Sequence, residues 1–231
     1  MNTGIFGPWL AGFSAWLEGV GNLLTPMLQG SVISIEVFFL TLLFALPLAL
    51  PVAFGRMSPI RIVRRAVNLY LLVMRGTPLI LQLLFVYFAP YYLFKNSAYS
   101  RFTAVVIAFV VNYAAYFAEI YRGGIESIPR GQYEAAKVLG FTKAQTFLRI
   151  VLPQVVKRSV PATANEVITL VKDTALAQTI GVAELFRAAQ TISARQFSVL
   201  PIFIAGGFYF VMNGVVSIAF EKIEKKLAYY R

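Results

Sequence analysis

The sequence predicts an all-α integral membrane protein with five transmembrane helices, an N-terminus outside the cell and a C-terminus inside it. Three observations support this fold class. Hydrophobic side chains make up 58% and charged side chains 13% of the 231 residues, and the mean hydropathy is +0.70, which is more apolar than an ordinary soluble domain. Five stretches approach the length of a membrane span, and Lys and Arg are concentrated on alternate sides of them.

The spans follow from the rule that a helix needs about 20 apolar residues to cross a bilayer. We place them at Val32–Phe54, Pro78–Phe94, Phe102–Tyr121, Pro161–Gly181 and Phe197–Phe220. Residues 1–27 precede the first span. The first 26 residues contain no Lys or Arg, so the charged start of a cleavable signal peptide is missing. Because this segment carries Trp9 and Trp16, it is predicted to be an interfacial lead-in.

The net charge of +11 could indicate nucleic-acid binding, but in a membrane protein basic residues are first tested as topology markers. Most of them fall on one side of the spans: Arg56, Arg61, Arg64, Arg65, Arg122, Arg130, Lys137, Lys143, Arg149, Lys157, Arg158, Lys222, Lys225, Lys226 and Arg231. The other side has Lys95, Arg101, Arg187 and Arg195. The positive-inside rule therefore predicts that the loop 122–160 and the C-terminus are cytoplasmic.

This loop has the start and stop signals of two short helices that are joined by a turn at a glycine. Ser127 and Pro129 are typical of a helix start and Gly140 of its end, while Thr142 and Gln145 have the spacing of a capping box. The second helix is predicted to end at Pro153.

Small side chains near the corner allow another surface to approach the backbone closely. Ala135, Ala136 and Gly140 supply them, and Glu134 adds a charge at their edge. This pattern indicates a surface that docks a partner protein. An amphipathic helix pair resting on lipid headgroups is the alternative, and the residues alone leave both open.

Ionisable groups inside a span are costly unless they face water or protein, so they are candidate functional residues. Asn112 and Glu119 share one face of the third span, and Glu166, Lys172 and Asp173 share one face of the fourth. Lys172 can meet an α-carboxylate and Asp173 an α-ammonium, which predicts the path of a zwitterion. Neutralisation of charge within the bundle is the alternative for both.

Arg75 precedes a helix-breaking Gly-Thr-Pro sequence, residues 76–78. A break of this kind frees backbone carbonyls that need donors. Arg75 is therefore predicted either to donate to these freed carbonyls or to form a structural ion pair or a gate, with Glu119 or Glu166 as its partner.

Specific motifs resemble the permease subunits of ABC importers that take up polar amino acids. Glu134-Ala135-Ala136, Gly140 and then Ile150-x-Leu152-Pro153 resemble the EAA loop of that family, and "RGTPLILQL" at 75–83 and "LVKDTALAQTIGVAEL" at 170–185 resemble its spans. The resemblance implies a permease transmembrane domain over 28–228, in which the loop 122–160 couples to an ATPase. Some family members bind the amino acid between the spans, which favours a functional role for Asp173.

The resemblance also implies partners. These are an ATP-binding cassette ATPase dimer, a second permease copy or homologue, and an extracytoplasmic amino-acid-binding protein, in a bacterial cell membrane. The chain lacks the GxxxxGK[ST] phosphate loop, so ATP and Mg are expected on the ATPase and no cofactor on this chain.

Two other functions compete with an ATP-driven permease. A membrane-embedded enzyme is disfavoured because the chain has no His or Cys and its carboxylates are dispersed; without these residues we also expect no metal site. An ion-coupled carrier is disfavoured because five spans show no internal repeat.

Overall fold

The structure is a computed structural model that describes residues 7–95 and 100–228. Among these residues every regular element is a helix, and there is no strand. The elements are α1 (Gly7–Arg56), α2 (Arg61–Gly76), α3 (Leu79–Phe94), α4 (Arg101–Glu126), α5 (Arg130–Val138), α6 (Lys143–Thr146), a π-helical turn η1 (Phe147–Val151), α7 (Leu152–Asp173), a 3₁₀ segment η2 (Thr174–Ile180), α8 (Leu185–Gln196) and α9 (Leu200–Leu227).

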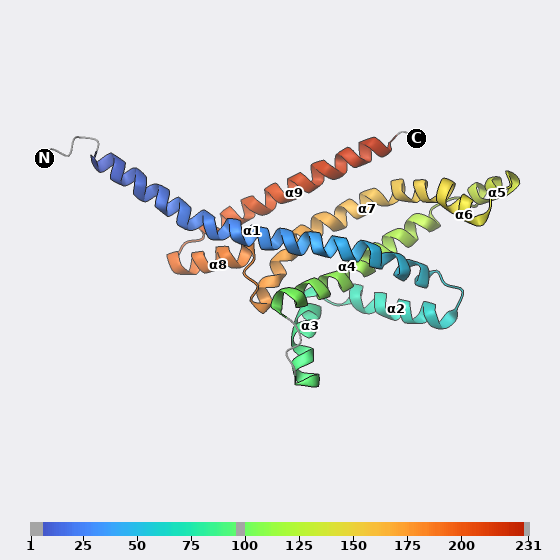
Figure 1. The fold of residues 1–231 in the computed structure, drawn as a ribbon, viewed down its shortest axis with the longest axis horizontal. Coiled ribbons are helices and arrows are strands. Elements are labelled where there is room, and N and C mark those ends of the chain that lie inside the picture. Colours follow the sequence, from blue (N-terminus) through green and yellow to red (C-terminus); the bar gives the residue numbers. More distant parts are fainter. Residues whose placement is uncertain (1–6, 96–99, 229–231) are drawn as a thin grey trace.

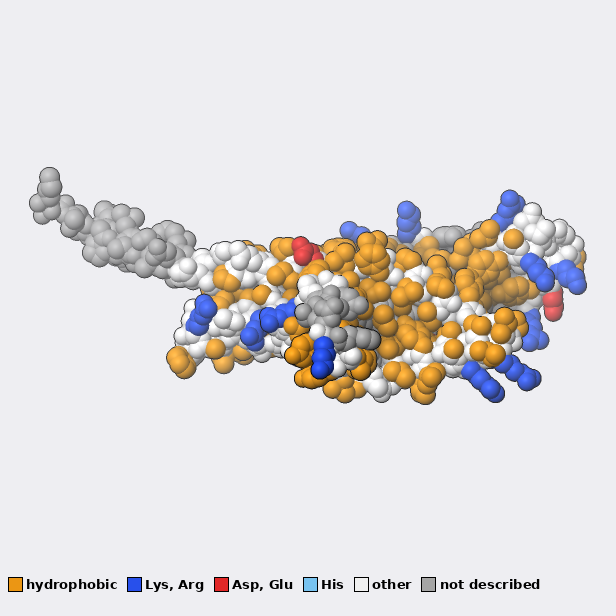
Figure 2. Space-filling model, turned by 60° about the horizontal axis from the view of Figure 1, so that its bottom comes forward, with side chains coloured by type: hydrophobic (Ala, Val, Ile, Leu, Met, Phe, Trp, Pro, Cys, Tyr) orange, Lys and Arg blue, Asp and Glu red, His pale blue; other side chains and the backbone are white. Residues whose placement is uncertain are grey.

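The helices form an elongated bundle (Figure 1). The N-terminal part of α1 lies at the same end as α8, and α5 and α6 lie at the opposite end. Figure 2 shows hydrophobic side chains over the middle of one face and a gathering of Lys and Arg at the α5–α6 end. Lipid tails and headgroups favour this division of apolar and basic surface.

The core is centred on α4, whose most extensive packing is against α1. Small side chains line the contact from both helices: Ala104, Ala108, Ala115 and Ala118 on α4, and Ala45, Ala49 and Ala53 on α1 are all buried. Small residues let two backbones approach closely, which is how helices associate where lipid weakens the hydrophobic effect. Phe109 and Phe117 fill the remaining space and are fully buried.

Three helical stretches among the described residues are long and apolar enough to cross a membrane: Gly19–Arg56 of α1, all of α4 and all of α9. The α2–α3 pair would be a fourth, but it is bent by 109° at its break. The helix α7, which carries Glu166, Lys172 and Asp173, is not among them. By length and composition, the described residues thus contain three candidate spans, or four if the bent pair is one span, where the sequence predicts five.

Several boundaries differ from the predicted ones. The helix α1 begins at Gly7, inside the predicted lead-in, whose residues 1–6 lie outside the described part of the chain. The predicted span Pro161–Gly181 is wrong as one α-helix, because α7 gives way to η2 after Asp173, and Gly181 ends η2 in the left-handed region. The helices α2 and α8 were not predicted, since both carry charges that interrupt an apolar run.

Candidate functional site

The break between α2 and α3 creates the polar centre of the bundle. Pro78 has no N–H to donate, so carbonyls at the end of α2 need other partners. The carbonyl of Met74 accepts hydrogen bonds from the Gln82 amide at 2.9 Å and from the Asn112 amide at 3.0 Å. Asn112 also donates to Gln82 at 2.9 Å. Amide side chains, rather than the predicted Arg75, therefore satisfy this carbonyl and join the break to α4.

A cavity of about 440 Å³ opens beside this break. Its walls come from the 77–80 segment, α4, α7 and η2, and its polar side chains include Asn112, Tyr113, Glu166, Thr169 and Asp173. No Lys or Arg is among its lining residues. The lining of the cavity therefore contains two carboxylates and no cationic side chain.

Asp173 is fixed by a neutral partner. Its carboxylate accepts a hydrogen bond from the Tyr113 hydroxyl at 2.7 Å, and no ion pair within 4.0 Å is found for it among the described residues. Tyr113 itself is buried between Phe109 and Phe117, and its ring contacts theirs. The hydroxyl thus orients the carboxylate without cancelling its charge.

The other residues predicted for the substrate path lie elsewhere. Lys172 is exposed and does not line the cavity, because its side chain leaves α7 about 100° away from that of Asp173. Glu119 lies in an arginine cluster nearer the end of α4 and lines a neighbouring cavity. The structure thus brings together Asn112, Glu166 and Asp173, and separates Lys172 and Glu119 from them.

Three arginines surround Glu119. Arg122 binds its carboxylate with Nε at 3.1 Å and Nη2 at 2.9 Å, while Arg56 and Arg75 approach it only to 3.5 and 3.6 Å. Arg75 also lies over the ring of Tyr116, 5.5 Å from its centroid, a cation–π geometry. Of the two predicted partners, Arg75 therefore pairs with Glu119 and not with Glu166.

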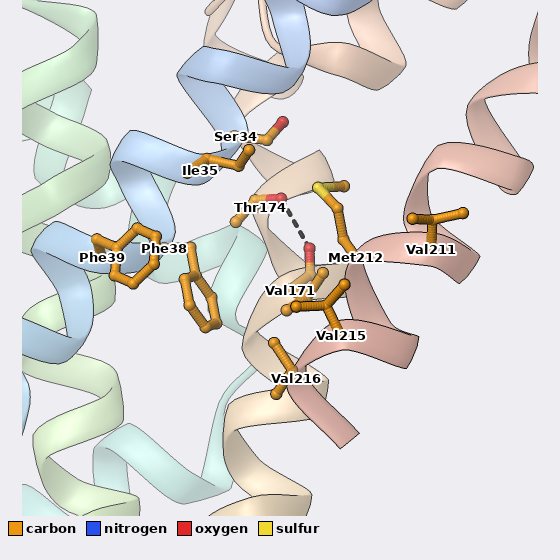
Figure 3. Close-up of a pocket in the computed structure, with 10 residues that line it drawn as sticks. All are labelled: Ser34, Ile35, Phe38, Phe39, Val171, Thr174, Val211, Met212, Val215 and Val216. Atoms are coloured by element: carbon orange, nitrogen blue, oxygen red, sulfur yellow. Dashed lines mark hydrogen bonds between the residues drawn. The ribbon is translucent and has the colours of Figure 1, made fainter. Parts of the chain in front are cut away.

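A second kind of cavity is apolar and lies between α1, α7 and α9 (Figure 3). It has a volume of about 240 Å³, and Phe38, Phe39, Val171, Met212 and Val215 are among its walls. The Thr174 hydroxyl beside it donates to the Val171 carbonyl at 2.7 Å. None of its lining residues is charged, so the polar cavity is the better candidate site for an amino acid.

The segment of residues 130–151, called the coupling segment after the role that the family resemblance implies, has the glycine corner and the capping box that the sequence predicts. The predicted end of its second helix at Pro153 is wrong, because α6, η1 and α7 follow one another without a break and Pro153 lies in the first turn of α7. The helix α5 ends before Gly140, whose φ of +77° is left-handed. Thr142 and Gln145 form the predicted capping box, with bonds of 2.9 and 3.2 Å. The N–H of Leu152 then bonds to the Phe147 carbonyl five residues back. Pro153, which follows this π-helical turn, cannot donate a backbone bond.

Exposure divides the residues predicted to contact an ATPase. Glu134, Ala135, Gly140, Leu152 and Pro153 are exposed and Ile150 is half-buried. Ala136 is only 1% exposed and faces the chain itself. The expectation that both alanines form an approach surface therefore fits Ala135 alone, because consecutive helical side chains point in different directions.

Sequence reasoning missed three residues that shape this region: Arg56, Gln82 and Tyr113. Tyr116 shares the polar face of the third span with Asn112 and Glu119 and is expected there. A tyrosine or glutamine in an apolar helix has no charge to mark it, and its partners lie 30 to 60 residues away. One signal was available for Gln82, because it lies one turn after Pro78 and can reach the carbonyls that the break frees.

Comparison with known proteins agrees with this architecture. Residues 45–229 match the family described as binding-protein-dependent transport system inner membrane component. The L-cystine transport system permease protein TcyB of Bacillus subtilis is 40% identical over 210 residues, which cover 89% of this chain and 88% of TcyB. The glutamine transport system permease protein GlnP of Escherichia coli is 34% identical over 202 residues, covering 87% and 92%.

A solved structure gives the same result. A crystal structure of an amino acid ABC transporter with histidines has a TM-score of 0.81 and 32% identity, and the match covers 93% of this chain and 98% of that one. The chain therefore belongs to the binding-protein-dependent transport system inner membrane component family and is a permease subunit of the ABC amino-acid importer class, a transport component rather than an enzyme.

Proposed function

We propose that this chain moves a polar amino acid into the cytoplasm of a bacterial cell, driven by a separate ATPase and supplied by an extracytoplasmic binding protein. The observation that carries the proposal is the cavity of about 440 Å³ in which Glu166 and Asp173 are present without a lining cation. Every amino acid brings an α-ammonium group that complements such a site.

The cavity residues have distinct roles in this proposal. Asp173, oriented by the Tyr113 hydroxyl, receives the α-ammonium or a cationic side chain through a charge-assisted hydrogen bond. Glu166, half-buried in the same wall, adds negative charge. Asn112 holds the α2–α3 break and so fixes the shape of the opposite wall.

The membrane arrangement that we propose has five crossings. The bent α2–α3 pair makes one of them, and α7 makes another with its charged face turned to the cavity rather than to lipid. The N-terminus is outside and the C-terminus inside, which places the coupling segment in the cytoplasm. There it docks on an ATPase subunit that holds ATP and Mg, and a second permease copy or homologue completes the pathway.

Uptake into vesicles tests the function. The permease is reconstituted with its ATPase, and uptake of labelled L-cystine, L-glutamine and L-arginine is measured with the binding protein present. We expect uptake only when ATP is supplied. Uptake driven by a proton or sodium gradient without ATP would identify an ion-coupled carrier, and no uptake under either condition would contradict a transport function for this assembly.

Cysteine labelling tests the orientation, because the native chain has no cysteine. Gln145→Cys lies in the coupling segment and Arg195→Cys on α8, and both positions are exposed. An impermeant thiol reagent should label the second in intact cells and the first only after the membrane is opened. The reverse pattern would overturn the proposed orientation.

A further inference from the structure

A second polar cavity adjoins the first and has the opposite charge. It has a volume of about 580 Å³, and Arg56, Asn68, Arg75, Tyr116 and Glu119 are among its lining residues. Tyr116 lines both cavities, which places them next to each other. The first cavity holds carboxylates and no lining cation, whereas this one holds two arginines and one carboxylate.

The arginines of this second cavity have hydrogen-bonding capacity left over. Glu119 is already engaged by two donors of Arg122. Arg56 and Arg75 remain 3.5 and 3.6 Å from it, beyond ordinary hydrogen-bond distance for N–H donors. A guanidinium has five N–H donors, and the buried Nε of Arg56 makes no hydrogen bond to any described residue.

Each arginine is nevertheless held in place by a neutral group. Arg56 donates a terminal N–H to the Asn68 side chain, and Arg75 lies over the Tyr116 ring. Both guanidinium groups line the cavity and share one carboxylate that Arg122 already binds, so they favour a further carboxylate in the cavity, because a planar guanidinium can bind a carboxylate through two parallel bonds.

We propose that this cavity binds the α-carboxylate of the transported amino acid, as a station between the polar cavity and the cytoplasm. The inference rests on the proposed function, since it concerns the same substrate. A zwitterion carries both an ammonium and a carboxylate, so two adjoining cavities, one with carboxylates and one with arginines, can hold it in turn, first by its ammonium and then by its carboxylate. The exposed Lys172 does not supply the carboxylate partner; Arg75 and Arg56 do.

Binding of paired ligands tests this assignment. The permease–ATPase complex is placed in lipid nanodiscs without the binding protein, so that any preference measured belongs to the membrane part. Equilibrium binding of L-arginine and L-glutamine is compared with binding of their α-carboxamides, which keep the ammonium and lose the carboxylate charge. We expect the acids to bind about ten- to hundredfold more tightly than the amides.

Arginine variants then locate that preference. Arg75→Gln and Arg56→Gln should each reduce the acid-over-amide ratio toward one, whereas Arg75→Lys, which keeps the charge, should retain part of it. Arg195→Gln removes an exposed arginine of α8 and serves as the matched control with a wild-type ratio. A thermal melt of each complex shows which variants are assembled, and Arg75→Lys and Arg56→Gln keep the test decisive if Arg75→Gln does not assemble.

The outcomes separate this inference from the function on which it rests. ATP-driven uptake is measured on the same preparation with the binding protein added. A complex that takes up amino acids but binds neither acid detectably, shows no preference for acid over amide, or keeps its preference in Arg75→Gln and Arg56→Gln contradicts the carboxylate station alone. A complex that takes up no amino acid contradicts the proposed function itself.

Discussion

The hydrogen bonds that hold Asp173 and Asn112 in the polar cavity join different helices, whereas the coupling segment is held together by near neighbours in the chain. Asp173 and Tyr113 are 60 residues apart and Asn112 and Met74 are 38 apart. In the coupling segment, Thr142 bonds to residues three and four positions away. The cavity therefore depends on how the helices pack, while the coupling segment keeps its shape as a unit.

The two regions also differ in how they are anchored. The cavity lies within the main core, where α4 packs against α1, α3 and α7. The coupling segment joins the bundle mainly through a small separate cluster around Ile128, Val151 and Val155. In the docking that we propose, η1 runs on into α7 and so carries the partner's motion to a helix that forms a wall of the cavity.

The largest effect is expected at the glycine corner of the coupling segment. Gly140→Asp should abolish uptake and copurification of the ATPase, because a side chain there enters the docking surface and strains a backbone with φ of +77°. Within the chain nothing lies within 4 Å of a Cβ at this position, so the permease itself should still insert and fold. Pull-down of the ATPase measures the loss.

Gly140→Asn separates the two causes, since asparagine tolerates the left-handed region. If the side chain obstructs docking, this variant also loses the ATPase. Copurification of the ATPase in wild-type yield with both variants would remove Gly140 from the docking surface.

The next largest effect is expected in the cavity. Asp173→Asn keeps the shape and a hydrogen bond to Tyr113 but loses the charge, so uptake should fall tenfold or more, as expected for about 1.5–3 kcal/mol of charge-assisted hydrogen bonding. Thermal stability should change little, because Asp173 has a tyrosine and not a cation as its partner. Both quantities are measured on one preparation.

The matched variant is Tyr113→Phe. It leaves the charge of Asp173 but removes the hydroxyl that orients it, so we expect a smaller loss of uptake than in Asp173→Asn. A large loss of stability in Asp173→Asn, with uptake falling in proportion, would mean that the carboxylate is structural instead.

The contrast between the regions also explains what could be predicted from the sequence. The corner at Gly140 and the capping box at Thr142 depend on residues within one turn, so their patterns were sufficient. The α-helix α7 ends at Asp173, and the chain bends sharply at the break around Pro78. The spacing of residues along one helix cannot predict which side chains from different helices meet in the cavity beside these two points. Lys172 is predicted to line the same path as Asp173, but consecutive helical side chains point about 100° apart, and the structure leaves Lys172 exposed.

A smaller effect is expected from the arginine cluster. Glu119→Gln removes the carboxylate that three arginines share, so their positive charges then repel one another. The thermal midpoint should fall by several degrees, as expected when the free energy of unfolding decreases by about 1–3 kcal/mol. The estimate is kept low because Arg75 is 45% exposed and water screens it. Glu126→Gln is the control, since Glu126 is 56% exposed and pairs with Arg122 alone. Equal midpoints for both variants would refute a stabilising role for Glu119.

The smallest effect is expected on the pH dependence of thermal stability. It concerns the carboxyl of Glu184, which lies between the predicted fourth and fifth spans. Glu184 is fully buried at the start of α8, where the N–H groups of Phe186 and Arg187 donate to it at 2.7 and 2.6 Å. Burial raises the pKa of this carboxyl above its usual range, although these bonds and one from the Tyr209 hydroxyl act in the opposite direction.

Because the pKa of Glu184 is higher in the folded chain than in the unfolded one, the folded state holds more protons between the two values. Its contribution to stability is therefore fully present at pH values below the unfolded pKa and is lost as the pH rises through the folded pKa. Glu184→Gln, which resembles the protonated acid, should remove this dependence. The midpoint of the wild type relative to Glu184→Gln should rise as the pH falls from about 7 to about 5, by about 2–4 °C for each kcal/mol. A difference that stays constant or shrinks on acidification would show that the bonds from Phe186 and Arg187 outweigh burial at this helix start.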